Sequence, residues 1–196
     1  YEYGLPQWVS GISLLSGCKE NFFCVARYKD KCVLEYYKNL TFEMKIDLPF
    51  TNISDLYVSD NKLVFKASSN ISEEQLIELE INDIYEFPIK KEMIKISDRI
   101  SQADTFWFKG FKGRNTHAWI YKSKFMNSKK SPLLVKVHSG PTSYFNGALN
   151  PEVQFWTSRG WFVAEINYSG SSGFGKEYRE RLNSNWGIAD SEDCKA

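Results

Sequence analysis

The chain has 196 residues, 42% of them hydrophobic and 16% aromatic, with 25 Lys and Arg against 24 Asp and Glu. These values exclude a membrane-spanning protein, which needs about 18 consecutive apolar residues, and a collagen-like or disordered protein, which needs a more biased composition. A formal net charge of +1 provides no overall field to attract nucleic acid or an anionic membrane, so we expect neither as a partner.

The first part of the chain is predicted to be all-β. Segments rich in β-branched and aromatic residues recur about every 10 to 13 residues, separated by turns of Asp, Asn, Lys and Ser. They are residues 21–28, 32–37, 42–48, 62–67 and 75–81. This spacing is typical of an antiparallel sandwich, barrel or set of propeller blades, and periodicity alone does not choose among them.

The clearest strand pattern in this part runs from Phe42 to Leu48. Its apolar residues alternate with Glu43, Lys45 and Asp47, so Phe42, Met44, Ile46 and Leu48 are expected on one buried face.

A change of character follows at Phe87-Pro88, and we interpret the polar stretch to Asp104 as a linker between two units. The second unit begins with predicted strands at 116–122 and 133–138. A helix is predicted at 152–159, ended by Gly160, and a strongly apolar strand at 161–166. Strand, helix and strand at this spacing form a βαβ unit, which predicts a mostly parallel sheet with helices on its faces.

Residues Lys109 to Lys136 contain eight Lys and Arg and no Asp or Glu. We interpret them as solvated strand faces and a hairpin turn; a nucleic-acid patch is the alternative.

The cysteines, Cys18, Cys24, Cys32 and Cys194, lack the close pairing of metal ligands, and we expect free thiols, no metal and a reducing, cytoplasmic setting. The N-x-[ST] sequons, at Asn39, Asn52, Asn70 and Asn167, would matter only in a secreted protein.

Two short segments at the ends of apolar strands are the candidate site. His138, Ser139, Gly140 and Pro141 follow the strand at 133–138, and residues 167–175 follow the strand at 161–166. Ligands and catalytic groups gather at strand C-termini in open α/β sheets. A small residue and a glycine there can turn a backbone N–H toward developing negative charge, as an oxyanion hole requires. The alternative is a buried His138 that is hydrogen-bonded to the backbone.

The second segment contains Asn167, Gly170, Gly173 and Gly175. The glycine spacing, G-x-x-G-x-G, is the reverse of the dinucleotide fingerprint, and no Gly-Lys-Ser/Thr follows as in a phosphate-binding loop. We therefore predict a structural turn and no cofactor.

No G-x-S-x-G nucleophile elbow occurs in the sequence. The two histidines, His117 and His138, precede the place of a nucleophile, whereas the order in α/β-hydrolases is Ser, Asp or Glu, then His. The candidate site is therefore at most an oxyanion wall.

Four segments together resemble the prolyl oligopeptidase family of serine peptidases, in particular its acylaminoacyl-peptidase and dipeptidyl-aminopeptidase branch. The family pattern runs H-G-G-P, S-R-G, N-Y-R/G-G-S-x-G-Y-G and W-G-x-x-D-x-x-D. The matching segments here are 133–142, 155–163, 167–182 and 186–193, and weaker matches occur at 6–11 and 48–51.

The resemblance implies the C-terminal blades of a β-propeller plus linker at 1–98, and the first part of an α/β-hydrolase domain at 99–196. It also implies an exopeptidase that cleaves short peptides and releases N-acylated amino acids. By position, the N–H of Gly140 would be one oxyanion donor, with His138 and Ser139 shaping the turn. Ser139 replaces the usual first Gly, and Ser169 takes a position often occupied by Arg or Gly.

The Ser-Asp-His triad would lie beyond Ala196, so this chain alone is expected to be inactive and to be a piece of a longer protein. The start at Tyr1 and the helix-like end, Ser191–Ala196, also suggest a piece. Expected partners are peptides or N-acyl-peptides, and the resemblance allows a homo-oligomer. The alternative function is a non-catalytic peptide-binding or interaction fragment of the same family.

Overall fold

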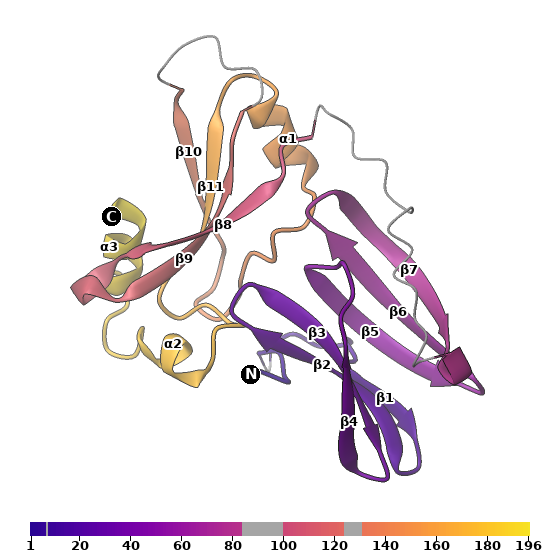
Figure 1. Ribbon diagram of the computed structural model, residues 1–196. Coiled ribbons are helices and arrows are strands. Elements are labelled where there is room, and N and C mark those ends of the chain that lie inside the picture. Colours follow the sequence, from indigo (N-terminus) through magenta and orange to yellow (C-terminus); the bar gives the residue numbers. More distant parts are fainter. Residues whose placement is uncertain (7, 84–99, 124–130) are drawn as a thin grey trace.

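The computed structural model describes residues 1–6, 8–83, 100–123 and 131–196. These residues form three β-sheets and a few short helices (Figure 1). Within these ranges, no helix is long and apolar enough to cross a membrane.

The first sheet is an antiparallel meander in the order β1-β2-β3-β4. Its strands are β1 (Leu15–Cys18), β2 (Asn21–Tyr28), β3 (Lys31–Lys38) and β4 (Thr41–Ile46). The turn between β3 and β4 holds Asn39 at φ 50° and Leu40 at φ 60°. Two consecutive positive φ angles match the twist of a two-residue hairpin turn, so this local conformation sets the β3–β4 pairing.

The second sheet has the order β5-β6-β7, again antiparallel. It contains β5 (Asn52–Ser59), β6 (Lys62–Ser69) and β7 (Ser72–Glu80), followed by the short helix η1 (Ile81–Asp83). One apolar core joins the two sheets, and its fully buried members are Val25, Leu34, Ile53, Leu63 and Phe65. The prediction of an antiparallel all-β part is confirmed; the described sheets do not close into a ring.

The predicted buried face at 42–48 is only partly correct. Ile46 is buried and Met44 packs at the edge of the core, but Phe42 is 47% exposed. The strand also ends at Ile46, before Leu48. The pairing of β3 with β4 shifts register between Tyr36 and Tyr37, so Phe42 pairs with Tyr37 and lies beside its ring, on the face opposite the core residues Tyr36 and Met44.

The third sheet has the order β10-β11-β9-β8. Its strands are β8 (Ala103–Lys109), β9 (Asn115–Tyr121), β10 (Leu133–Val137) and β11 (Phe162–Asn167), and helix η3 (Phe111–Gly113) links β8 to β9. β10 and β11 pair in parallel, as the βαβ pattern predicts. The other two pairings, β11 with β9 and β9 with β8, are antiparallel. The prediction of a mostly parallel sheet is therefore wrong for these strands, because the short link at η3 makes β8 and β9 a hairpin.

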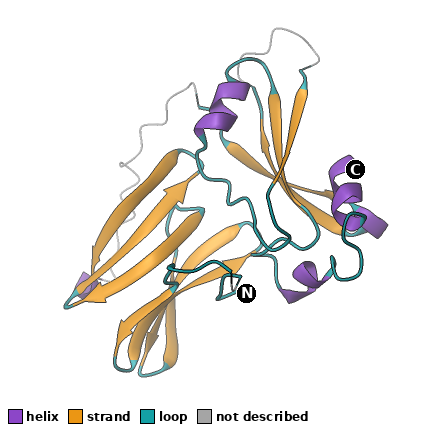
Figure 2. Cartoon of the chain, turned by 180° about the vertical axis from the view of Figure 1, so that it is seen from behind, coloured by secondary structure: helices purple, strands orange, loops and turns teal. Residues whose placement is uncertain are grey.

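Helices cover both faces of this sheet (Figures 1 and 2). α1 (Pro151–Thr157) packs with Trp119, Tyr121 and Val163 on one face. The opposite face carries Ala118, Ala164 and Ile166 and is covered by the segment containing α2 (Lys176–Glu180) and α3 (Ala189–Lys195). Neighbouring residues of β9 and β11 thus point to opposite faces, as the pleat of a strand requires.

The predicted boundary between residues 98 and 99 lies outside the described residues, as does most of the predicted linker at 87–104. The end of that linker belongs instead to β8, which the sequence patterns did not predict. Lys124, Lys129 and Lys130 of the basic segment also lie outside the described residues. Lys122 pairs with Asp104, and Lys136 pairs with Glu152 and Glu165.

The all-β sheets contact the third sheet through the chain's first residues and through loops. In both ribbon views the N-terminus lies between the first sheet and α2 (Figures 1 and 2). The Trp8 indole N–H donates to Oγ1 of Thr142 at 2.9 Å, and the Leu149 N–H donates to the Ser69 carbonyl at 2.7 Å. Loop 138–150, which follows β10, is therefore held against both all-β sheets.

Candidate active site

The turn at His138, Ser139 and Gly140 lies directly after β10. Gly140 has φ +68°, a conformation that glycine adopts without strain. Among the described residues, the Gly140 N–H has no hydrogen-bond acceptor, while its carbonyl accepts from the Tyr168 hydroxyl at 2.7 Å. The turn therefore fixes Gly140 through its carbonyl and leaves its N–H available.

Tyr168, which directly follows β11, stabilises the same turn. Its hydroxyl proton is shared between the Gly140 carbonyl and the His138 carbonyl, which lies 3.0 Å away, and its ring stacks on the His138 imidazole with 4.3 Å between centroids. Burial raises the pKa of Tyr168 to about 12, so the hydroxyl keeps the proton that it donates.

Both ring nitrogens of His138 are occupied. Nδ1 lies 3.1 Å from the Gly140 carbonyl, and Nε2 lies 2.7 Å from Oγ of Ser171. Burial lowers the pKa of His138, opposed by its contacts to the Ser139 and Gly140 backbone. In the neutral ring, Nδ1 donates to the Gly140 carbonyl, while Nε2 lies beside a hydroxyl, that of Ser171, which donates to the Tyr168 carbonyl at 2.7 Å. This geometry suits a residue that shapes the turn; its role stays a prediction.

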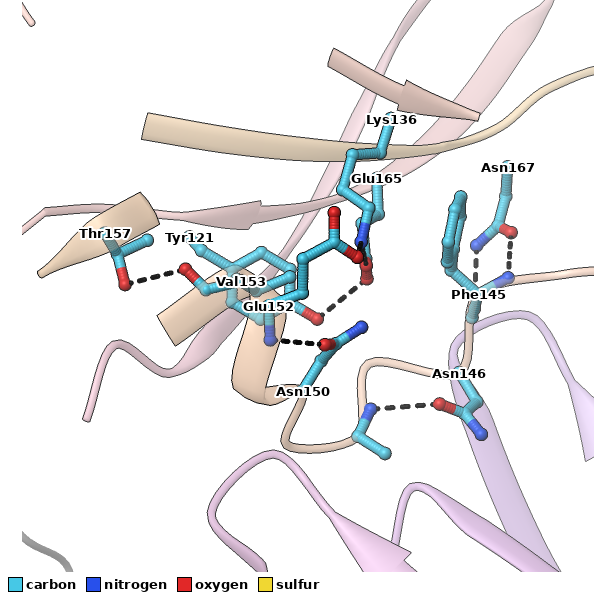
Figure 3. A network of polar contacts seen from close by, with 11 residues as sticks. Tyr121, Lys136, Phe145, Asn146, Asn150, Glu152, Val153, Thr157, Glu165 and Asn167 are labelled. Atoms are coloured by element: carbon cyan, nitrogen blue, oxygen red, sulfur yellow. Dashed lines mark hydrogen bonds and ion pairs between the residues drawn. The ribbon is translucent and has the colours of Figure 1, made fainter. Parts of the chain in front are cut away.

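Asn167 connects the two strand-end loops. Its Oδ1 accepts from the Phe145 N–H at 2.7 Å and its Nδ2 donates to the Phe145 carbonyl at 3.0 Å, as Figure 3 shows. Nδ2 also lies 3.1 Å from Nδ1 of His117. The fully buried Asn167 side chain, at the end of β11, therefore forms hydrogen bonds with the backbone of loop 138–150.

The glycines of residues 170–175 all have positive φ. A Cβ on Gly170 would meet Leu182 at 2.8 Å and the Pro141 carbonyl at 3.2 Å, so Gly170 lies beneath the candidate turn. The N–H groups of Gly173 and Gly175 both donate to Oε2 of Glu2. The geometry is that of a structural turn, in which these backbone N–H groups donate to an acceptor of the same chain.

The sequence patterns did not predict two carboxylates that form hydrogen bonds with these loops. Glu2 forms an ion pair with Arg179 as well as accepting from the two glycines, and 171 residues separate it from Gly173, so no local pattern could reveal it. Asp193 is 1% exposed and accepts from the N–H groups of Ser169 and Phe111. Its position in the W-G-x-x-D-x-x-D segment was the available signal.

A second network supports the βαβ unit from the α1 side (Figure 3). The buried carboxylate of Glu165 on β11 accepts from the Tyr121 hydroxyl at 2.9 Å and lies 3.3 Å from Nζ of Lys136. Burial raises the pKa of Glu165, while Tyr121 and Lys136 oppose this shift. Lys136 and Glu165 are register partners of the parallel pair, so the ion pair bridges β10 and β11.

A cavity of about 370 Å³ lies between the all-β sheets and the loop that follows the candidate turn. Thr142, Ser143 and Tyr144 line one wall, and Arg27 and Asn52 line the other. Within the described residues, no group of three or more His, Cys, Asp and Glu could hold a metal ion.

Comparisons with known proteins point to one family. Residues 148–196 match the model described as "Prolyl oligopeptidase family". Dipeptidyl-peptidase 5 of Aspergillus fumigatus is 35% identical over 98 residues, which cover 47% of this chain and 13% of that protein. The chain thus spans about an eighth of the length of the curated relatives that it matches first.

Solved structures of larger enzymes contain the same arrangement. The crystal structure of puromycin hydrolase matches 100% of this chain and 31% of its own, with a TM-score of 0.84 and 29% identity. An acylaminoacyl peptidase of Pyrococcus horikoshii matches 94% of this chain and 29% of its own, with a TM-score of 0.71 and 18% identity. The latter shows the fold alone.

Proposed function

Because the chain belongs to the prolyl oligopeptidase family of serine peptidases, we propose that it is part of an exopeptidase that hydrolyses short peptides and releases N-acylated amino acids. The observation that carries the proposal is the Gly140 N–H, which is held after β10 with no acceptor among the described residues. Such a donor stabilises the oxyanion that forms when a nucleophile attacks a peptide carbonyl.

In this mechanism, Gly140 supplies one of the two oxyanion donors. The Tyr168 hydroxyl and the His138 ring keep the turn in place, so the N–H is oriented before the substrate carbonyl arrives. The second donor would be the N–H after the nucleophile, and the Ser, Asp and His of the triad would lie beyond Ala196. The 196-residue chain is therefore expected to be inactive by itself.

The all-β sheets, within residues 1–98, would be C-terminal blades of a β-propeller that screens substrates. Supporting this part of the proposal, the first sheet is a four-stranded antiparallel meander, as in a propeller blade. The residues from 99 onward would be the first part of the hydrolase domain. The four cysteines are unbridged, in keeping with the cytoplasmic location that we propose.

Release of an unblocked dipeptide is the second candidate activity. It is favoured by the curated relatives, several of which are named dipeptidyl-peptidase 5 and are 33–37% identical. The test compares N-acetyl-Ala-p-nitroanilide with Ala-Ala-p-nitroanilide as substrates of the full-length protein. Faster cleavage of the acetylated substrate supports the proposal; exclusive cleavage of the unblocked one assigns the dipeptidyl activity.

The alternative of a non-catalytic peptide-binding fragment makes a different prediction for the gene. Reading onward from Ala196, the enzyme requires a G-x-S-x-G within roughly 50 residues, then Asp and His in that order. A stop codon there in the native gene would leave only the binding function.

A further inference from the structure

Arg27 is a buried cation without a counter-ion. The side chain is on β2, 5% exposed, and it forms no ion pair with any carboxylate in the described parts of the chain. Nη2 makes two long hydrogen bonds, at 3.4 Å to Oδ1 of Asn52 and 3.3 Å to the Ile53 carbonyl. Nη1 is buried and has no partner. A buried charge in this state is costly unless an anion compensates it.

The two carboxylates that line the same cavity as Arg27 are already paired with another cation. Asp55 and Glu74 line the same 370 Å³ cavity as Arg27, and each lies within 4 Å of Nζ of Lys66. Glu2, whose backbone pairs with that of Arg27, directs its carboxylate to Arg179 and to two glycine N–H groups. Within the described residues, Arg27 therefore lines the cavity without forming an ion pair.

A water molecule does not neutralise the positive charge of Arg27. A second cavity beside Arg27 has a volume of only about 20 Å³, which is room for about one water molecule. Asp30 also lines this cavity, but no ion pair joins it to Arg27 among the described residues. That water could accept a hydrogen bond from Arg27, but it would leave the guanidinium charge uncompensated. The site calls for an acceptor that carries negative charge, and a carboxylate fits the guanidinium geometry.

The cavity also adjoins the candidate oxyanion turn. The Arg27 guanidinium lies over the Tyr144 ring, 5.4 Å from its centroid, and the Tyr144 hydroxyl donates to Oδ1 of Asn52 at 3.1 Å. Four residues separate Gly140 from Tyr144, which spans at most about 14 Å. A peptide of a few residues that starts at the turn can therefore extend along this loop toward Arg27.

We propose that Arg27 binds the C-terminal carboxylate of short peptides in the cavity between the all-β sheets and loop 138–150. This inference rests on the proposed peptidase function and specifies its substrates: short peptides with a free C-terminus, rather than C-terminally amidated ones or long chains. Arg27 acts here as a specificity residue and takes no part in bond cleavage.

The test is binding, measured by calorimetry on the full-length protein. The probe is the tripeptide Ala-Ala-Phe with both peptide bonds N-methylated to prevent cleavage, as the free acid and as the C-terminal amide. We expect the acid to bind about 10 to 100 times more tightly, the range of a charged hydrogen bond. Arg27→Gln should reduce this ratio to about one, and Arg27→Lys should retain part of it.

Lys66→Gln is the matched control, because it removes another cation that lines the cavity but is already paired with Asp55 and Glu74. It should leave the preference for the acid intact. Equal binding of acid and amide to the unmodified protein would overturn the proposal and would indicate that another carboxylate of the full-length protein neutralises Arg27. A preference for the acid, together with no hydrolysis of the unmethylated Ala-Ala-Phe, would uphold the carboxylate site and count against the peptidase function.

Discussion

His117 shows how one buried side chain makes the fold sensitive to acid. It is fully buried between Trp107 and Trp119, each with its ring about 5 Å away. Its Nε2 lies 3.0 Å from Oγ1 of Thr105, and Nδ1 faces the Asn167 amide. Burial lowers the pKa of His117 from 6.5 to about 4, because the charged ring would lose its hydration.

This shift predicts a loss of stability between pH 6.5 and pH 4. In that range the unfolded chain binds a proton at residue 117 and the folded chain does not, so unfolding gains up to about 3 kcal/mol as the pH falls. Unfolding followed by tryptophan fluorescence at pH 7, 5.5 and 4 should show this loss. A His117→Gln variant should be less stable at pH 7 and should show a weaker pH dependence. Equal pH dependence in both proteins would contradict the account.

Asp193 is the residue that ties α3 to the strand ends. Its carboxylate accepts from the N–H groups of Phe111 and Ser169 and from the Thr116 hydroxyl, at 2.7–3.0 Å. An Asp193→Ala substitution leaves three donors without this acceptor, two of them on buried residues, which should lower the free energy of unfolding by about 3 kcal/mol or more. Asp190→Ala on the same helix is the control and should cost less than about 1 kcal/mol. Similar costs in chemical denaturation would argue against this role.

At the scale of elements, α1 depends on an N-terminal cap, formed by Asn150. Oδ1 of Asn150 accepts from the Glu152 N–H at 2.9 Å, and Pro151 occupies the first helical position. Asn150→Ala should therefore destabilise the protein by about 1 kcal/mol, while Asn150→Ser should keep most of the stability. Equal losses for the two variants, measured by denaturant unfolding, would show that the cap is not the cause.

Local patterns predicted the elements whose signals are local. The βαβ unit follows from apolar strands around a capped helix, and Gly160 has the positive φ expected after that helix. β1 was missed because it is four residues long, and β5 because Ser54 and Asp55 interrupt its alternation at a register shift. β8 was missed because its outward face is aromatic, with Phe106 50% exposed, so it lacks an apolar and polar alternation.

The candidate site also contains residues that local patterns predict and partners that they do not. Gly140 and the loop glycines stand next to strands in the sequence, and that position, together with the family resemblance, predicts them as site residues. The partners that make the site specific, Tyr168 on the His138 ring and Glu2 at the 170–175 turn, are set by tertiary packing. Their contacts join segments that are 30 to 173 residues apart, which no spacing rule in a single sequence reaches.

At the scale of the whole molecule, Glu2 joins the first sheet to the 170–175 turn and α2, which follow the third sheet. Its backbone pairs with Arg27 of β2, while its carboxylate binds the Gly175 N–H at 3.2 Å and pairs with Arg179. The contact is mostly buried, with the Glu2 side chain 9% exposed. Glu2 therefore restrains the N-terminal residues against the turn beneath the candidate site.

Glu2→Gln keeps an acceptor oxygen but removes the charge. We expect hydrogen exchange at the Gly173 and Gly175 amides to become at least about tenfold faster, because charged hydrogen bonds are about twice as strong as neutral ones. Glu177→Gln on α2 is the control, since that side chain is 94% exposed. Unchanged exchange in Glu2→Gln, or equal acceleration in both variants, would contradict the restraint.

Reaction of the full-length protein with a fluorophosphonate probe tests the central claim most directly. An oxyanion turn at Gly140 has a purpose only if an activated serine attacks a carbonyl beside it, and fluorophosphonates label such serines covalently. The account predicts stoichiometric labelling of one serine C-terminal to Ala196, located by peptide mass spectrometry, together with loss of peptide hydrolysis. A folded full-length protein that takes up no label and cleaves no peptide would contradict it.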